Sequence, residues 1–314
     1  MTSRHLVDPQ LLALIDPALS PPITQVNLSE RRAAMAARFA GLPRPTVTPV
    51  QFLIPQPGSP DVPVLVYDPG EDRSGAAILH IHGGGMIAGR PELTIYGTAP
   101  LALAMGIKVV SVDYRLAPET PFPGPQEDCF AALTWLFDQA NRLGISRNRI
   151  AISGESAGGG LAAALAIMTR DRGGPMPVAQ FLTCPMLDHR TGGPDDSYSN
   201  AITGEFIWTR EHNRFGWDAL CGDYDVDDAR AAWFSPALAS DLAGLPPAWL
   251  AVGSLDLFFD ESLEYARRLA AASVGVELHS YPGAVHGFNT ADQTDVFRTF
   301  AGHFRDGLAA RFGL

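Results

Sequence analysis

The sequence has few cysteines, no long run of apolar residues and no cluster of basic ones. Its three cysteines, Cys129, Cys184 and Cys221, are odd in number and far apart, which excludes the disulfide framework of a small secreted domain. The apolar run near the N-terminus, residues 11–15, is bracketed by aspartates and prolines. It is too short for a signal-peptide core or a membrane span. These absences predict a soluble protein in a reducing, cytoplasmic setting.

Positive charge is scarce as well. The chain has 23 Lys and Arg against 34 Asp and Glu, and its formal net charge is -11. Such an acidic protein is a poor partner for nucleic acid or an anionic membrane, so we expect neither as a partner. What the sequence does contain is a hydrophobic fraction of 46% over 314 residues. That is enough for the core of an ordinary globular protein.

Short apolar runs alternate with helical patterns along most of the chain. Two runs separated by a proline-rich turn, residues 47–54 and 62–67, predict an antiparallel pair of strands. Further strands are expected at 76–81, 108–112, 150–153, 178–183, 249–252 and 277–281, and helices at 93–105, 127–143, 157–170, 261–272 and 295–312. The alternation predicts an α/β fold with a mostly parallel sheet covered by helices on both faces.

Two segments do not follow this alternation. Residues 1–45 are punctuated by prolines and contain one expected helix, at 29–39, with Ser29 as its N-cap. Residues 188–235 have a polar, glycine-rich part and then an aromatic part. Long insertions at the carboxyl edge of such a sheet are usually lids or binding walls. We therefore expect one main domain, residues 46–187 and 236–314, with a small cap and an N-terminal arm packed on it.

The most informative stretch is residues 154–158, Gly-Glu-Ser-Ala-Gly, between an expected strand and an expected helix. G-x-S-x-G at such a place is the turn that exposes a serine hydroxyl at a helix N-terminus, where developing negative charge is favoured. The glycines are needed because a side chain would crowd the neighbouring strand or helix. Ser156 is therefore the candidate nucleophile.

A serine nucleophile needs a base to take its proton and an acid to orient that base. Asp256 and His286 each follow an expected strand, and so lie at the same edge of the sheet as Ser156. The order serine, acid, histidine is that of hydrolases with this turn. Asp260 and Glu261 are alternative acids, but acidic residues favour a first helical turn, so we expect these two to cap the following helix and Asp256 to be the acid.

A loop for the oxyanion follows the strand expected at 76–81. Residues 82–85 read His-Gly-Gly-Gly and fit the HGGG-type loop of lipases and esterases. Glycines let backbone N–H groups turn towards a tetrahedral oxyanion. We expect the N–H groups of Gly83, Gly84 and Ala157 to form the oxyanion hole.

Two features of the sequence suggest a metal site, but each lacks residues that such a site needs. His80 and His82 share a strand face, but the sequence offers no third ligand nearby. The acidic run at 223–228 has Asp228 where a calcium loop needs glycine and leads to Phe234 where it needs glutamate. We therefore expect no metal and no other cofactor.

Together, the motifs resemble those of the bacterial hormone-sensitive-lipase-like (family IV) carboxylesterases of the α/β-hydrolase superfamily. The resemblance extends from residue 47 to the C-terminus, and its motifs occur in the family's order: residues 82–85, 113–119, 154–159, 256 and 286–288. The chain departs from the family pattern at three places. Glu155 stands where aspartate is frequent, Leu257 where proline commonly follows the acid, and Thr120 where histidine is usual.

The resemblance implies an α/β-hydrolase fold with an eight-stranded, mostly parallel sheet and a helical cap that includes the N-terminal arm. It implies a cofactor-free, cytoplasmic serine carboxylesterase that cleaves short- to medium-chain acyl esters, and frequently a homodimer. A small-molecule ester is then the expected partner. Catalysis would pass through an acyl-enzyme on Ser156.

Three aromatic residues of the insertion, Phe206, Trp208 and Phe215, are expected to line an apolar substrate pocket, although packing within the cap explains them equally well. Two other functions remain open. The same residues could hydrolyse amides, lactones or carbamates, and a protein of this fold could bind a small molecule without catalysis. Intact Ser156 and His286 count against the last alternative.

Overall fold

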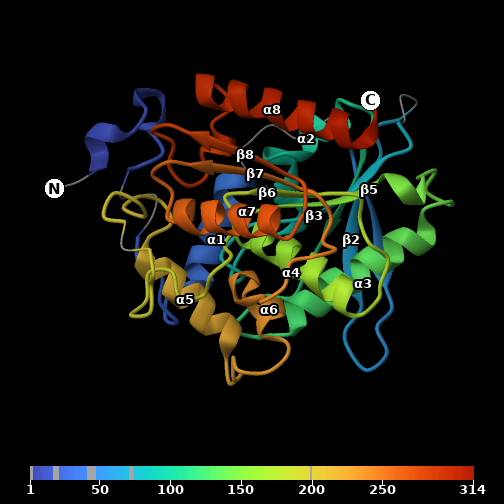
Figure 1. The fold of residues 1–314 in the computed structure, drawn as a ribbon, viewed down its shortest axis with the longest axis horizontal. Helices are drawn as coiled ribbons and strands as arrows, with labels where there is room; N and C mark the ends of the chain where they lie inside the picture. The colour runs from blue at the N-terminus through green and yellow to red at the C-terminus, as the bar shows by residue number, and fades with distance from the viewer. Residues whose placement is uncertain (1–2, 17–20, 41–46, 71–73, 199) are drawn as a thin grey trace.

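The computed structural model describes residues 3–16, 21–40, 47–70, 74–198 and 200–314. In this part of the chain one eight-stranded sheet runs in the order β1-β2-β4-β3-β5-β6-β7-β8 (Figure 1). β2 is antiparallel to both β1 and β4, and all other neighbours are parallel. The strands are β1 (Val50–Ile54), β2 (Val62–Tyr67), β3 (Ala77–Ile81), β4 (Lys108–Val112), β5 (Ile150–Glu155), β6 (Gln180–Thr183), β7 (Ala248–Gly253) and β8 (Val276–Tyr281). The mostly parallel sheet expected from the sequence is confirmed.

Helices cover both faces of this sheet (Figure 1). One face packs against α3 (Gly124–Gln139), α4 (Ala157–Asp171) and α7 (Phe259–Ala271), and the other against α2 (Ala99–Leu103) and α8 (Asp295–Phe312). Side chains alternate between the two cores, so Leu250 lies in the first and Trp249 in the second. Because successive residues of a strand point to opposite faces, most residues of a strand that is buried on both sides are apolar.

One expected helix is interrupted. In place of a continuous helix at 93–105, the chain forms a short 3-10 helix, η4 (Pro91–Tyr96), and then α2. Gly97, between them, packs against Glu155: a Cβ on it would stand 3.0 Å from that carboxylate. The prediction of one helix was wrong because this tertiary contact overrides the helical pattern.

The N-terminal segment contacts both the insertion and the main body. Its helix, α1 (Leu28–Ala40), begins one residue before the expected Ser29. Arg32 donates to both carboxylate oxygens of Glu119 and to the carbonyls of Ile87 and Ala117. Farther towards the N-terminus, the carbonyl of Pro21 lies 3.2 Å from His212 Nε2, in the insertion.

Residues 188–235 contain α5 (Arg210–Cys221) and the short α6 (Ala231–Phe234). Further 3-10 helices are η1 (Ser3–Leu6), η2 (Pro9–Leu11), η5 (Arg147–Arg149), η6 (Pro236–Leu238) and η7 (Phe288–Thr290). Among the described residues, none of the helices has the length and apolar character needed to cross a membrane.

Candidate active site

Ser156 occupies a strained turn between β5 and α4. Its backbone has φ 56° and ψ -122°, a combination that costs energy and persists only where the surroundings impose it. Its N–H donates to the Thr183 carbonyl at 2.9 Å, and its carbonyl accepts from Met186 N at 3.0 Å. Both contacts come from β6 and the loop after it, so the neighbouring strand fixes the turn from outside.

The glycines of the turn are required by close backbone contacts. A Cβ on Gly158 would stand 2.0 Å from the carbonyl oxygen of Ile81, and one on Gly154 would stand 2.2 Å from that of Gly158. Real Cβ atoms do not approach backbone so closely, which explains the G-x-S-x-G pattern at this place.

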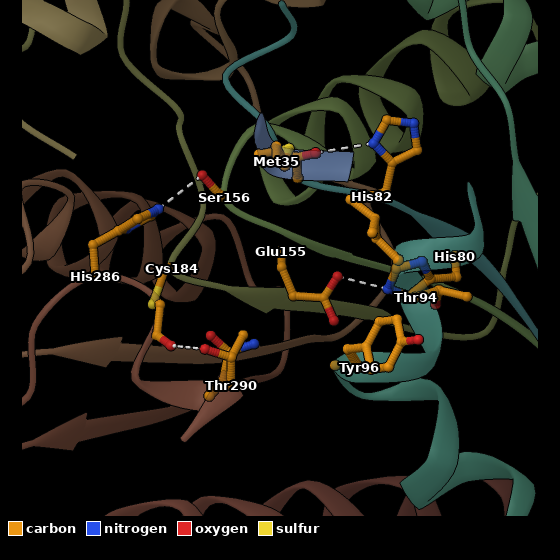
Figure 2. Close-up of a pocket in the computed structure, with 15 residues that line it drawn as sticks. Met35, His80, His82, Thr94, Tyr96, Glu155, Ser156, Cys184, His286 and Thr290 are labelled. Carbon is orange, nitrogen blue, oxygen red and sulfur yellow. Dashed lines mark hydrogen bonds and ion pairs between the residues drawn. The ribbon is translucent and has the colours of Figure 1, made fainter. Parts of the chain in front are cut away.

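The three residues predicted to act together meet at the carboxyl edge of the sheet. His286 Nε2 lies 2.9 Å from Ser156 Oγ (Figure 2). His286 Nδ1 lies 2.9 Å from Asp256 Oδ2. The other carboxylate oxygen of Asp256 accepts from Phe258 N at 3.0 Å. The Asp256 side chain is fully buried. Serine, imidazole and carboxylate thus form one continuous line of hydrogen bonds.

The two alternative acids lie elsewhere. Asp260 accepts from the Asn200 amide at 2.9 Å. Glu261 accepts from Leu187 N at 2.7 Å and from the Thr191 hydroxyl. Burial raises the pKa of Glu261 well above its usual value, opposed by those two hydrogen bonds. Asp256 is the carboxylate that reaches the imidazole.

The glycine loop after β3 lies against the nucleophile. A Cβ on Gly83 would stand 3.3 Å from Ser156 Cβ and 2.9 Å from the carbonyl oxygen of Glu155. Within the described residues, the N–H groups of Gly83, Gly84 and Ala157 have no protein acceptor. Gly83 lies against Ser156 and Ala157 follows it in the chain, so unpaired backbone donors lie near the nucleophile, as a developing oxyanion requires.

The same loop is held from behind by aromatic residues. Tyr114 donates its hydroxyl to the carbonyl of His82 at 2.9 Å, and the two rings stack with centroids 4.2 Å apart. Burial lowers the pKa of His82 to about 4. A neutral, stacked imidazole therefore supports the backbone that carries Gly83.

A cavity of about 160 Å³ opens beside Ser156. Its walls come from η4, α1, the glycine loop and the loop that carries His286, and include Met35, Leu93, Thr94, Tyr96, Asn289 and Thr290. Figure 2 shows Thr94 and Tyr96 across the cavity from Ser156 and His286.

The aromatic residues expected to line the pocket do not line this cavity. Trp208 packs on the glycine loop, where a Cβ on Gly85 would clash with its ring, and its centroid is 6.4 Å from that of His286. Phe215 packs against the first core, which includes residues of the insertion, and Phe206 packs against the second. Of the two explanations the sequence left open, packing describes these side chains better.

Sequence reasoning missed the partners of Glu155. Its carboxylate accepts from His80 Nε2 at 2.6 Å and from the hydroxyl and N–H of Thr98 at 2.6 and 3.3 Å. Burial acts to raise the pKa of Glu155, but the charge and hydrogen bond of His80 and the bonds from Thr98 outweigh it and hold the pKa below its usual value. This cluster ties the segment between η4 and α2 to the residue before the nucleophile.

Comparison with known proteins agrees with this geometry. A family model described as the alpha/beta hydrolase fold matches residues 78–290. Esterase LipI of Mycobacterium tuberculosis is 33% identical over 292 residues, which are 91% of this chain and 88% of that protein. Among solved structures, a bacterial heroin esterase superposes with a TM-score of 0.87 at 34% identity, and a hormone-sensitive lipase from a metagenome library with 0.83 at 30%. Each superposition covers 99% of both chains.

Proposed function

Because the chain belongs to the α/β-hydrolase fold family, and within it to the hormone-sensitive-lipase-like (family IV) carboxylesterases, we propose that Ser156, Asp256 and His286 are its catalytic triad. The protein is a carboxylic ester hydrolase, as its similarity to esterases indicates. The observation that carries the residue assignment is the line of two 2.9 Å contacts from Asp256 through His286 to Ser156.

The acylation step uses each of these contacts. His286 Nε2 takes the hydroxyl proton as Ser156 Oγ attacks the acyl carbon. Asp256 accepts from Nδ1–H, which keeps Nε2 free to act as a base and stabilises the imidazolium that forms. The imidazolium then gives its proton to the leaving alcohol, and the acyl group stays on Ser156. In the second step water attacks this acyl-enzyme, again with His286 as the base.

Negative charge on the carbonyl oxygen is met by the unpaired N–H groups of Gly83, Gly84 and Ala157. Such donors are already oriented before the reaction, so no reorganisation opposes the charge as it develops. They form the proposed oxyanion hole.

We further propose that the cavity beside Ser156 receives short to medium acyl chains. Its walls across from the nucleophile, at Thr94 and Tyr96, limit the length that fits. A series of p-nitrophenyl esters from acetate to palmitate tests this, with the highest kcat/KM expected at or below about eight carbons. A maximum at palmitate would contradict the proposed size limit.

A cap formed jointly by residues 1–45 and the insertion at 188–235 is also proposed. It is supported by the contact of Pro21 with His212 and by Met35 of α1, which lines the cavity.

Three free cysteines suit a reducing, cytoplasmic setting. A homodimer is proposed from the family resemblance and is tested by light scattering during size-exclusion chromatography.

A fluorophosphonate probe tests the nucleophile directly. The wild type should be labelled, Ser156→Ala should not, and Ser146→Ala, which removes an exposed hydroxyl, should be labelled like the wild type. Equal labelling of Ser156→Ala would rule out Ser156 as the nucleophile.

Asp256→Asn should lower kcat by about 10⁴, because the imidazole then loses its orienting carboxylate.

A further inference from the structure

Cys184 lies beside the triad but has no part in the proposed mechanism. It follows β6 directly and is buried, in a backbone conformation with φ 46°. Its thiol, a carboxylate oxygen of Asp256 and a ring nitrogen of His286 all lie within 4.8 Å of one another. Cys184 also lines the cavity that contains Ser156, and Figure 2 shows it at the same end of that cavity as His286.

We propose that Cys184, Asp256 and His286 form a binding site for Zn²⁺ and that the bound ion inhibits the enzyme reversibly. Thiolate, carboxylate and imidazole are the ligands that zinc prefers. The thiolate also discriminates against Mg²⁺ and Ca²⁺, which favour oxygen ligands. A fourth ligand, water, can come from the cavity. The ion is an inhibitor here and has no role as a cofactor.

The geometry needs little adjustment to hold the ion. Zinc bonds of about 2.0–2.3 Å place neighbouring ligand atoms of a tetrahedron roughly 3.5 Å apart. His286 Nδ1 and Asp256 Oδ2 are 2.9 Å apart, and the Cys184 thiol lies within 4.8 Å of a carboxylate oxygen of Asp256 and of a ring nitrogen of His286. A movement of about one ångström by the Cys184 side chain completes the set.

Charge and protons balance in this site. A thiolate and a carboxylate together neutralise a divalent cation, so no unpaired charge is left buried. The thiol proton of Cys184 is released to solvent as its sulfur–zinc bond forms. His286 remains neutral: zinc takes the place of its Nδ1 proton, and the single ring proton resides on Nε2.

That change of tautomer explains the inhibition, which rests on the proposed role of His286 as the base. In the active enzyme Nε2 has the free electron pair that accepts the serine proton. With zinc on Nδ1, a proton occupies Nε2 and the pair is no longer available. Asp256, now a zinc ligand, no longer orients the ring. Metal binding itself does not depend on the esterase assignment.

Two measurements on the full-length protein test the proposal. The first is a Cd²⁺ titration that follows cadmium–thiolate charge-transfer absorption, and the second is hydrolysis of p-nitrophenyl acetate at increasing Zn²⁺, followed by addition of EDTA. The variants are Cys184→Ala and Cys184→Ser. Cys221→Ala is the control, because this half-buried thiol lies at the C-terminal end of α5 and does not belong to the proposed group of ligands. Each rate is divided by the metal-free rate of the same variant.

The wild type and Cys221→Ala should show the absorption and lose activity with Zn²⁺, and EDTA should restore it. Both Cys184 variants should lose the absorption and need at least about tenfold more Zn²⁺ for the same inhibition. Unchanged absorption in folded Cys184 variants would refute the site, and unchanged inhibition would refute its effect on catalysis. A metal-free wild type that cleaves no ester would instead refute the proposed function, while the Cd²⁺ titration would still decide whether the site exists.

Discussion

Replacing Gly83 by alanine tests the proposed oxyanion hole with a single methyl group. The added Cβ would stand 2.9 Å from the carbonyl oxygen of Glu155 and 3.3 Å from Cβ of Ser156. Carbon atoms prefer separations of about 3.5–4.0 Å, so the glycine loop or the serine turn must move by roughly half an ångström. Either movement changes the distance from the Gly83 N–H to the oxygen of the tetrahedral intermediate.

The size of the effect follows from the geometry that an oxyanion donor needs. Such a donor must lie about 2.7–3.1 Å from the oxyanion, and loss of one typically lowers kcat by about 10²–10³. Gly84 and Ala157 would still donate, so a residual rate remains. KM should change much less than kcat, because the glycine loop is only one wall of the cavity and the walls formed by η4 and α1 are untouched.

Steady-state kinetics with p-nitrophenyl butyrate measure this change. Gly302→Ala in α8 is the matched control: a Cβ there meets no atom within 4 Å, so its kcat should equal that of the wild type, with stability raised by about 0.5–1 kcal/mol. If Gly83→Ala keeps kcat within about threefold of the wild type, the loop supplies no essential oxyanion donor. A change confined to KM would equally contradict the reasoning.

Three further predictions concern stability and the cap. The pKa of His82 is 6.5 when unperturbed and about 4 in the folded protein. Protons therefore bind the unfolded chain more strongly than the folded one. The free energy of unfolding should be highest above about pH 6.5 and should decrease by about 3 kcal/mol as the pH falls to 4. Urea unfolding at pH 7 and pH 4.5 should show a smaller decline in His82→Gln, and an equal decline would disprove this account. Glu155→Gln keeps the shape of the side chain but removes the negative charge that faces His80. The free energy of unfolding, measured with urea, should decrease by about 1.5–3 kcal/mol. A change near zero would be inconsistent with this prediction. Arg32→Ala removes an exposed ion pair with Glu119 and two part-buried hydrogen bonds to the carbonyls of Ile87 and Ala117, so the free energy of unfolding should decrease by about 1–3 kcal/mol, less than a folded protein of this size typically has. Its kcat/KM should nevertheless decrease, because α1 forms one wall of the cavity, and unchanged kinetics would argue against a role of the arm in the cap.

The convergence of the proposed triad could be predicted from the sequence because each of its members follows a strand of a parallel sheet. Carboxyl ends of parallel strands meet at one edge, so recognising three strands was enough to bring Ser156, Asp256 and His286 together. The limits of a short strand such as β4 (Lys108–Val112), which is buried on both faces, also agreed with the sequence prediction.

The cavity walls could not be predicted in this way. Tyr96 and Thr290 lie in short 3-10 helices, whose positions depend on how the segments pack and not on a periodic pattern. For Phe206 and Trp208 the sequence offers two burial environments of similar polarity, the cap and the pocket, and residue type does not separate them. Packing decided between the two.

The partners of Glu155 depend on strand register. β3 and β5 pair so that His80 lies opposite Ser153, two residues before Glu155 and on the same strand. Composition identifies both strands but does not determine their register at single-residue level. The sequence therefore shows that Glu155 replaces the shorter aspartate of the family, but it does not show that His80 is the residue that Glu155 contacts.

The position of β8 has a consequence for heating. It is the last strand at one edge of the sheet, hydrogen-bonded to β7, and the loop after it presents His286. Edge elements open locally at a lower free energy than the core strands. Warming should therefore separate the imidazole from the serine while the central strands and α4 are still folded, so that enzymatic activity disappears, reversibly, at temperatures where circular dichroism still reports native secondary structure.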